Sequence, residues 1–447
     1  MRLKGNMHRR GEEHYEEARL AATWNERKPD RFPASIVLAE EISDVQEAVR
    51  FAAAEGLQVK ARSGGHSWTA SSIRDDTVLI DLSRISELSF DEEKGIAIVA
   101  PGSKGRDLNA MLDARGLFFP SGHCPSVGLG GFLLQGGWGW LSRAVGPACM
   151  SVVGVDVVTA DGELIHADEE QNTDYLWAAR GSGAGYFGVV TRFYLRTHHL
   201  RRSIFESVYA YPMDVRDQLL SWVAEIEPEL PAEVEVAVMG TTPRHEDGSV
   251  IEGELGLVVM ASVMMDDEED ARAAIGRLDE FPLIDRATER RTLMPRTFVQ
   301  LYDGPDSLEP EGFRWAADGM WTDNPVEDLL PEIEELFTSV PSSASHVFWY
   351  PWREQQLDNA AISVQGKLYV AAFAGWTDPA EDDRFIPWPA EQMGKLEHLS
   401  KGIQLADENL VARPARFLSP ENEARLEELR ARYDPDSRFA GYLIAAS

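Results

Sequence analysis

The sequence predicts an α+β protein that folds as at least two domains. Its 447 residues exceed the roughly 250–300 residues at which a single hydrophobic core stops growing. Helical and strand patterns alternate in the first half, whereas the second half contains strand-like runs, several of them rich in aromatic residues, with helical patterns between them. The second pattern predicts an antiparallel sheet with helices on one face.

The first half contains two clear helical patterns. One covers Asp44–Glu55, with Ser43 as the expected N-cap and Gly56 as the C-terminal stop. The other covers 104–115 and stops at Gly116. Strands are expected where β-branched residues alternate and turn residues follow, with a hairpin turn at 161–163. These strands are 57–65, 77–83, 95–102, 152–159 and 188–197.

In the second half, helical patterns lie between the strand-like runs. Helices are predicted at 215–226, 268–280 and 325–340. A charged amphipathic helix is predicted at 419–433, followed by the turn YDPDSRF. The predicted strands are 234–240, 255–263, 345–352 and 360–376.

Composition excludes several classes of function. The net charge of −32 disfavours binding to nucleic acid or to anionic membranes. Two cysteines are too few for a secreted disulfide scaffold, and no apolar run reaches the ~18 residues of a membrane span. No set of residues has the spacing of a known metal site. We therefore expect a soluble, cytoplasmic protein without a metal.

Three glycine-rich segments indicate a large phosphate-bearing ligand. They are ARSGGHS (61–67), PSGHCPSVGLGGFLLQGGWGW (120–140) and RGSGAGYFGVVTRF (180–193). Clustered glycines allow positive φ and close approach of a backbone, and successive N–H groups then suit a pyrophosphate. The Rossmann, P-loop and nucleophile-elbow motifs are all absent. The ligand is therefore predicted to be a dinucleotide held without a Rossmann loop.

The same motifs resemble a known family. RSGGHS at Arg62–Ser67, GHCPSVGLGG at Gly122–Gly131 and RGSGAGYFGVVT at Arg180–Thr191 resemble the FAD-binding domain of the vanillyl-alcohol oxidase and para-cresol methylhydroxylase (PCMH) superfamily, in its berberine-bridge-enzyme-like branch. The resemblance covers about 31–200 and resumes at Tyr433–Phe439. It implies a two-part, PCMH-type FAD-binding domain at 1–205, a substrate domain with a helix-covered antiparallel sheet at 206–405, and a C-terminal segment at 406–447 that returns to the FAD domain.

The resemblance implies that FAD is bonded to the protein twice. His66 matches the histidine that bonds the 8α-methyl carbon of the isoalloxazine, and Cys124 matches the cysteine that bonds carbon 6. A thiolate is a strong nucleophile, and a neutral imidazole nitrogen can attack an activated methyl group. Cys149 is expected to be structural or merely near the ring.

Further FAD contacts follow from matching positions. Their shared feature is that they lie in or beside the glycine-rich loops. The expected pyrophosphate cradle consists of Arg62, Ser63, Gly64, Gly65, His66, Ser67, Ser126, Val127, Gly130 and Gly131. Gly136, Gly137 and Gly139 belong to the same loop system, and Gly188 and Val190 are expected at the adenine end.

The family resemblance also implies a reaction. The flavin accepts a hydride at N5 from an alcohol, sugar, amine or activated C–H substrate, and dioxygen then takes the electrons to give hydrogen peroxide. The candidate catalytic bases are Tyr302, Tyr350, Tyr369 and Tyr442, and His346 and Gln365 are expected to line the pocket. Five tryptophans suggest an aromatic cavity, namely Trp315, Trp321, Trp349, Trp352 and Trp376.

Several alternatives stay open at the level of sequence. The C-terminal FAGYLI replaces the polar F-x-x-N-Q-x-I of many relatives, which leaves the substrate class undetermined. A flavin dehydrogenase with another acceptor, a non-catalytic flavin-binding protein and a nicotinamide-dependent reductase of the superfamily's cell-wall branch share most motifs. The expected partners are a small-molecule substrate and dioxygen, and the expected assembly is a monomer or homodimer.

Overall fold

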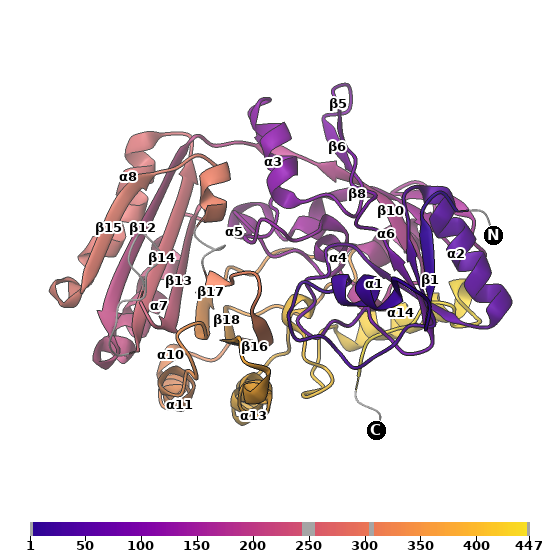
Figure 1. The fold of residues 1–447 in the computed structure, drawn as a ribbon. Coiled ribbons are helices and arrows are strands. Elements are labelled where there is room, and N and C mark those ends of the chain that lie inside the picture. Colours follow the sequence, from indigo (N-terminus) through magenta and orange to yellow (C-terminus); the bar gives the residue numbers. More distant parts are fainter. Residues whose placement is uncertain (1–2, 244–254, 304–307, 445–447) are drawn as a thin grey trace.

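The computed structural model describes residues 3–243, 255–303 and 308–444. Within these residues the strands form two groups that lie side by side (Figure 1). One group combines a four-stranded, a five-stranded and a two-stranded sheet from the first half of the chain. The other is a single seven-stranded sheet from the second half. This confirms the predicted mixed α+β architecture.

The four-stranded sheet has the order β1-β2-β4-β3. Strands β2, β4 and β3 pair in parallel, and β1 joins β2 antiparallel. Helix α2 connects β2 to β3, the two parallel strands that lie on either side of β4, and parallel strands require a crossover of this kind. The elements are β1 Asn6–Arg9, α1 Tyr15–Ala21, β2 Ser35–Leu38, α2 Ile42–Glu55, β3 Gln58–Arg62 and β4 Thr77–Asp81.

Helix α2 begins earlier than the sequence pattern suggests. Its N-cap is Glu41, which forms a capping box with Asp44, so the prediction of Ser43 as the cap is wrong. The acid at each position of the box satisfies a backbone N–H of the first turn. Gly56 ends the helix in the left-handed conformation, with φ of 68°, as expected.

The five-stranded sheet is antiparallel, with the order β5-β6-β10-β8-β9. Leu426 and Leu429 of the C-terminal helix α14 (Pro420–Tyr433) pack into its core, and Val59 of β3 bridges Phe439. The strands are β5 Leu88–Asp91, β6 Ile96–Val99, β8 Val152–Val158, β9 Leu164–Asp168 and β10 Val189–Arg196, with β7 Leu117–Phe118 and β11 His198–His199 paired beside them. The helices are α3 Gly105–Asp113, α4 Leu129–Leu134, α5 Ser142–Val145 and α6 Thr173–Ala179.

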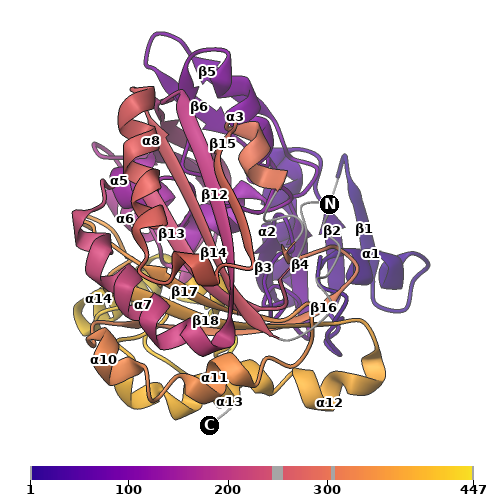
Figure 2. The ribbon, with the colours of Figure 1, turned by 90° about the vertical axis from the view of Figure 1, so that its left-hand side faces the viewer.

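The seven-stranded sheet is antiparallel throughout, with the order β15-β12-β14-β13-β17-β18-β16. Helices cover one of its faces, which Figure 2 presents to the viewer. The strands are β12 Ser203–Pro212, β13 Val234–Thr241, β14 Gly256–Met265, β15 Glu289–Pro295, β16 Arg314–Thr322, β17 His346–Pro351 and β18 Leu368–Trp376. The helices are α7 Arg216–Ile226, α8 Glu268–Gly276, α10 Val326–Leu329, α11 Glu334–Thr338, α12 Asp382–Phe385 and α13 Trp388–Lys395.

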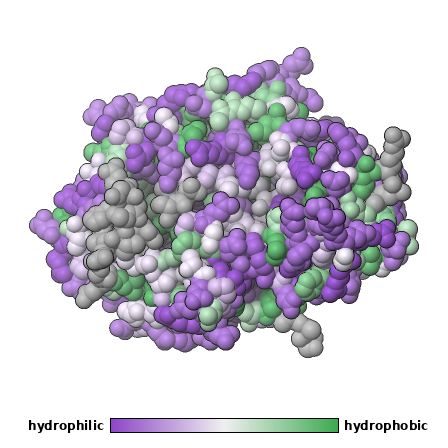
Figure 3. Space-filling model, viewed as in Figure 1, coloured by the Kyte–Doolittle hydropathy of each residue, from purple (hydrophilic) through white to green (hydrophobic). Residues whose placement is uncertain are grey.

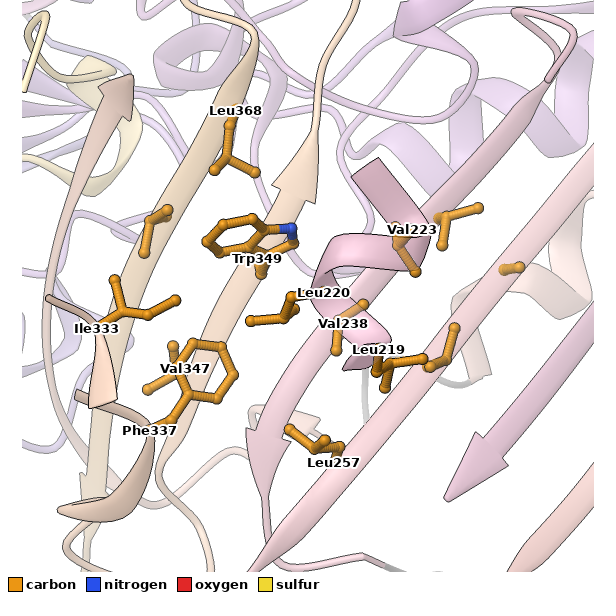
Figure 4. Close-up of a cluster of buried hydrophobic side chains, with 14 of the residues drawn as sticks. Leu219, Leu220, Val223, Val238, Leu257, Ile333, Phe337, Val347, Trp349 and Leu368 are labelled. Carbon is orange, nitrogen blue, oxygen red and sulfur yellow. The ribbon is translucent and has the colours of Figure 1, made fainter. Parts of the chain in front are cut away.

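A large hydrophobic core fills the space between this sheet and its helices. Leu219, Leu220 and Val223 of α7 point toward Val238 and Trp349 of the strands (Figure 4). Successive strand residues point to opposite faces, so the neighbours of these core residues face away from the helices. That second face is the one that forms a wall of the functional site.

The structure corrects two boundaries in the second half. The predicted helix over 325–340 is two short helices, α10 and α11, because Pro331 cannot continue a helix and disfavours it in the residue before. The predicted strand over 360–376 begins only at Leu368. The predicted domain boundary after 205 falls inside β12, and the division into domains stays a prediction.

The surface seen in Figure 3 is largely hydrophilic, with scattered apolar residues. The large hydrophobic side chains exposed among the described residues are Leu164, Val411 and Ile444. None of the described helices combines the length and the apolar composition that a bilayer span requires.

Candidate functional site

A cavity of about 470 Å³ lies between the two groups of sheets. Its walls come from distant parts of the chain: β3 and the loop after it, the segments 122–138 and 183–189, the C-terminal pair Phe439–Ala440, and strands β12, β13, β14, β17 and β18. The first half supplies glycine-rich backbone, and the seven-stranded sheet supplies side chains from its helix-free face. Its volume lies within the roughly 300–1,000 Å³ that is usual for small-molecule and cofactor sites.

Two of the glycine-rich loops touch backbone to backbone. A Cβ built on Gly64 would lie 2.5 Å from the nitrogen of Gly128, and one on Gly128 would lie 2.6 Å from the nitrogen of Gly64. Gly65 has φ of 73°, and the Ser63 hydroxyl accepts a hydrogen bond of 3.1 Å from the N–H of Gly131. The sequence needs glycine here because no side chain fits between the loops.

His66 and Cys124 meet at the cavity through one hydroxyl group. The Oγ of Ser126 lies 3.1 Å from Nε2 of His66 and 3.5 Å from Sγ of Cys124. Both His66 and Cys124 line the cavity. The two nucleophilic side chains, 58 positions apart in the sequence, are therefore brought together as the resemblance implied.

The imidazole of His66 is held neutral. Burial, together with the charges of Lys104 and Arg62, lowers its pKa to about 3. Its ring stacks on Trp24, with a centroid separation of 4.8 Å and an interplanar angle of 19°. A neutral, oriented imidazole has a lone pair available for bond formation.

The predicted cofactor residues divide into two sets. Those that line the cavity are Arg62, Ser63, Gly64, Gly65, His66, Ser67, Cys124, Val127, Gly131 and Gly188. The others lie behind this wall, and they are Ser126, Gly130, Gly136, Gly137, Gly139 and Val190. A Cβ on Gly136 or Gly137 would lie 2.8 Å from the side chain of Ile362 or Ala148, respectively, so these two glycines are required for packing.

Arg62 lines the cavity, and its guanidinium group is bonded within the protein. Its guanidinium donates to the carbonyls of Ala21, Ala22 and Ser63 and lies 3.4 Å from Asp81. These contacts tie the glycine loop to the segment after α1.

The four candidate tyrosines separate into two pairs. Tyr302 lies outside the cavity wall, where its hydroxyl is 2.7 Å from Ser121 and 3.0 Å from Asn109. Tyr442 also lies outside it and donates to the carbonyl of Ser182 at 2.6 Å. Tyr350 and Tyr369 line the cavity and are cross-strand neighbours in β17 and β18.

Tyr369 is joined to a carboxylate that sequence reasoning missed. Its hydroxyl donates to Oδ2 of Asp407 at 2.6 Å. Asp407 also accepts from Trp68 at 2.8 Å and from Gln404 at 2.6 Å. Burial raises the pKa of Asp407, and burial with the Asp407 charge raises that of Tyr369 well above 10. Asp407 ends a short 3₁₀ helix, Leu405–Asp407, whose sequence carries no signal of such a role.

Three further acids line the cavity wall: Glu206, Glu235 and Glu309. Burial raises the pKa of Glu235 to about 7, and burial with the nearby Asp407 charge raises that of Glu309 to about 8. In the strand pattern VEVAV, Glu235 stands between Val234 and Val236, which are both buried. A charged residue within an apolar strand is the signal that could have identified it.

The aromatic lining only partly matches the expected one. Trp321, Trp352 and His346 line the cavity, whereas Gln365 lies outside it and accepts a hydrogen bond from Trp352. The remaining candidate tryptophans, Trp315, Trp349 and Trp376, are not lining residues. Trp138 and Trp140, which the sequence left between packing near the cofactor and packing in the core, also line it, as does Trp68.

Three indole groups are poised to bind a ligand. The buried Nε1–H groups of Trp138, Trp140 and Trp321 have no hydrogen-bond partner, and all three residues line the cavity. Buried donors without partners are costly, so acceptor atoms of a bound molecule would stabilise them. With the glycine cradle and the two nucleophiles, these groups fit a flavin dinucleotide.

Cys149 takes no part in the cavity. It is fully buried against Ala360 and Ile362, and burial raises its pKa to about 12. A thiol in this environment stays protonated and is a small hydrophobic residue.

Comparison with known proteins agrees with this site. The family described as "FAD binding domain" matches residues 33–168. The FAD-linked oxidoreductase nodO of Hypoxylon pulicicidum is 34% identical over 441 residues, covering 96% of this chain and 95% of that protein. The FAD-linked oxidoreductase ptmO of Penicillium ochrochloron is 33% identical, covering 96% and 94%.

Solved structures show the same fold. 6-Hydroxy-D-nicotine oxidase from Arthrobacter nicotinovorans superposes with a TM-score of 0.86 at 21% identity, covering 99% of this chain and 98% of that one. The berberine-bridge-enzyme-like protein 1 of Physcomitrella patens gives a TM-score of 0.81 at 18% identity, with the same coverage. By sequence and by fold, this chain belongs to the FAD-linked oxidoreductases, with the PCMH-type FAD-binding architecture of the berberine-bridge-enzyme-like branch.

Proposed function

We propose that this enzyme is an oxidase whose FAD is bonded covalently to both His66 and Cys124. It would oxidise a small molecule and pass the electrons to dioxygen, which gives hydrogen peroxide. The observation that carries the proposal is the contact of one hydroxyl, Ser126 Oγ, with both nucleophilic side chains. The 8α-methyl group and carbon 6 belong to the same benzenoid ring, so two bonds to the ring require two nucleophiles that lie close together.

Each bond to the ring is an oxidation that must be balanced. Forming it replaces a C–H hydrogen of the ring system with a C–N or C–S bond and releases two protons and two electrons. Dioxygen can accept these to give hydrogen peroxide. The protein supplies a neutral imidazole at His66, and it supplies a thiol at Cys124 beside a hydroxyl that can take part in proton transfer.

The protein's own groups would then remove the substrate proton. When bound, the flavin supplies hydride acceptance. Tyr369 faces the cavity and already donates to Asp407 at 2.6 Å, so its hydroxyl can accept a proton from a substrate O–H or N–H while its own proton passes to the Asp407 carboxylate. Trp68 and Gln404 hold that carboxylate in place.

Acid precipitation tests the covalent bonds. Flavin colour should stay with the precipitated wild-type protein, stay in part with H66A and C124A, and be lost to the supernatant from the double variant. Two matched controls lie outside the cavity: H166A at a half-exposed histidine and C149A at the buried cysteine. A wild-type protein that releases all of its flavin would refute the covalent proposal.

A dehydrogenase is the alternative for the electron acceptor. One protein of this fold, Phl p 4, is a glucose dehydrogenase as the wild type and a glucose oxidase as a doubly substituted variant, at TM-scores of 0.79 and 0.80 and 17% identity. The acceptor can therefore change within the fold. Peroxide release under air, compared with reduction of an artificial dye under nitrogen, separates the two for this enzyme.

A further inference from the structure

The feature that carries a further inference is Glu235, a buried acid on the cavity wall. Its side chain belongs to β13 and is 5% exposed, and it lines the cavity. One of its carboxylate oxygens, Oε1, has no hydrogen-bond partner. Burying a carboxylate oxygen without a partner is costly, and burial raises the pKa of this group to about 7. The carboxyl group as a whole already interacts with the hydroxyl of Tyr350 and with the backbone of Leu141 and Ser142, so Oε1 is the oxygen that is left for a donor or a cation of a ligand.

Glu235 is part of a polar row across the sheet. It pairs in register with Ser262 of β14, and Ser262 pairs with Glu206 of β12. Directly opposed residues of neighbouring strands share a face, and all three line the cavity. This places two carboxyl groups on the same wall with a single small hydroxyl residue between them.

The cations near this row are behind the wall. Arg143 lowers the pKa of Glu235, but its guanidinium is hydrogen-bonded to Glu227 and to the carbonyl of Val234. Arg296 pairs with Glu206. Neither arginine lines the cavity, and Arg143 faces two carboxylates with one charge, so the row has an excess of negative charge.

The rest of this end of the cavity adds no compensating charge. Asp407 is bonded to neutral donors only, and Glu309 has a neutral neighbour in His346, whose pKa burial lowers to about 4. Among the described lining residues, the lysines and arginines are represented by Lys60 and Arg62 alone. Both belong to β3 in the first half of the chain. The ammonium of Lys60 donates to the carbonyl of Ala184 and to those of Ala440 and Gly441 in the C-terminal segment.

Aromatic side chains complete the same wall. Phe348, Tyr350 and Trp352 follow one another on the cavity face of β17 and the residues after it. Aromatic faces attract cations, and more strongly when water is excluded. An anion would be repelled by the acidic row. A neutral alcohol would leave the negative charge of the row uncompensated.

We propose that the substrate is an amine that enters the cavity with a protonated nitrogen, and that Glu235 binds this nitrogen through Oε1, with Glu206 adding charge from the neighbouring position in the row. This rests on the proposed function, because it names the class of substrate for the same oxidation. Binding would fix the nitrogen at the sheet and leave the rest of the molecule between the aromatic side chains. The proton would be given up to the protein before the C–H bond next to nitrogen is oxidised.

Three probes that share a ring and differ in charge test the proposal. Benzylammonium, benzyl alcohol and benzoate are titrated into the flavin-loaded protein without oxygen at pH 8, with tryptophan fluorescence and flavin absorbance as the readouts. We expect benzylammonium to bind at least tenfold more tightly than benzyl alcohol, and benzoate to bind most weakly. E235Q should weaken benzylammonium binding by about ten- to a hundredfold, as for loss of a charged hydrogen bond, and change benzyl alcohol binding less than threefold.

The matched control is E233Q. Glu233 is a nearby acid that pairs with Arg201 at 3.1 Å and is not a cavity residue, so its replacement should leave all three affinities unchanged. If E235Q does not fold, the three-probe comparison on wild type still decides, and E206Q serves as the second variant. Equal binding of benzylammonium and benzyl alcohol, or an equal loss of both in E235Q, would overturn the proposal. A protein that purifies without flavin colour would refute the proposed function. Tryptophan fluorescence would still report binding of the three probes to that protein, so the amine preference is tested independently.

Discussion

Replacing Gly64 with alanine inserts a methyl group between two loops that touch through their backbones. The new Cβ would lie 2.5 Å from the nitrogen and 3.0 Å from the Cα of Gly128. Backbone atoms cannot rotate away as a flexible side chain can, so the two loops must separate. Overpacking of this kind typically costs about 1–3 kcal/mol, and we expect G64A to lose that amount of stability. His66 follows Gly64 in the sequence, and Cys124 precedes Gly128. Separation of the two loops should therefore lower flavin retention as well.

The reciprocal substitution probes the same contact from the other side. A Cβ on Gly128 would lie 2.6 Å from the nitrogen and 2.9 Å from the Cα of Gly64, so G128A should have a similar cost. Once one methyl group has pushed the loops apart, the second meets less resistance. The double variant should therefore lose clearly less stability than the two single losses added together.

Urea unfolding followed by tryptophan fluorescence measures these differences, with flavin content recorded in parallel. The matched control is G131A, in the same loop, because the nearest atom to its new Cβ is the Ser63 hydroxyl at 3.8 Å. It should be neutral or slightly stabilising, since alanine favours a helix over glycine by up to about 1 kcal/mol. A G64A variant as stable as wild type, or strictly additive losses, would show that the loops are not in the tight contact described here.

Three further predictions follow from the cavity and its supports. Y369F should keep its flavin but slow flavin reduction by about 10²–10⁴-fold, as expected for loss of a proton acceptor, measured by anaerobic stopped flow; Asp407 should then be unable to compensate. E309Q should flatten the pH dependence of stability: the folded-state pKa of about 8 exceeds the ordinary 4.5, so the wild-type contribution is full below about pH 4.5 and is lost as pH rises through about 8. R413M should cost about 3–5 kcal/mol in urea unfolding, because it leaves the buried Asp318 without its partner.

Each of these predictions has a control or a contrary outcome. Unchanged reduction rates in Y369F would assign the proton transfer elsewhere, with Tyr350 next in line. An unaltered pH profile in E309Q would mean that Glu309 is not buried as a neutral acid. For R413M the comparison is K401M, which breaks an ion pair with Asp323 that is 41% exposed on both sides and should cost at most about 1 kcal/mol.

The glycine-rich part of the site and the strongly periodic elements of the first half could be predicted because they depend on local sequence, whereas β1, β2 and β5 were missed. Helix α2 and strands β3, β4 and β8 have clear periodicity, and the glycines of the loops are required by contacts in which no Cβ fits. His66 and Cys124 stand beside those glycines, so a local motif was enough to place them together. Resemblance to a family then supplied the chemistry that spacing alone does not give.

The part of the site in the second half was harder to predict from the sequence. A residue belongs to that part only if its side chain points to the cavity face of the sheet. Trp349 and Tyr350 are neighbours in sequence, yet the first lies in the helix-side core and the second on the cavity wall. Without the register of the sheet, the tyrosines could not be sorted, and Tyr302 and Tyr442 were included although they bond to Ser121 and Ser182 elsewhere. Strands β12, β15 and β16 were not predicted at all.

The two walls of the cavity, glycine-rich loops on one side and a sheet face on the other, differ in how freely their residues can change. The cofactor side is backbone against backbone, so most changes there disturb the fold and the flavin together. The substrate side is a sheet face whose alternate residues point away from the helix-covered core. Residues such as Glu206 and Glu235 can therefore be exchanged without repacking that core, which is held by their sequence neighbours Phe205 and Val236. Relatives that share the flavin loops can differ in substrate at these positions, and the charge of this row is the property that should be compared among them first.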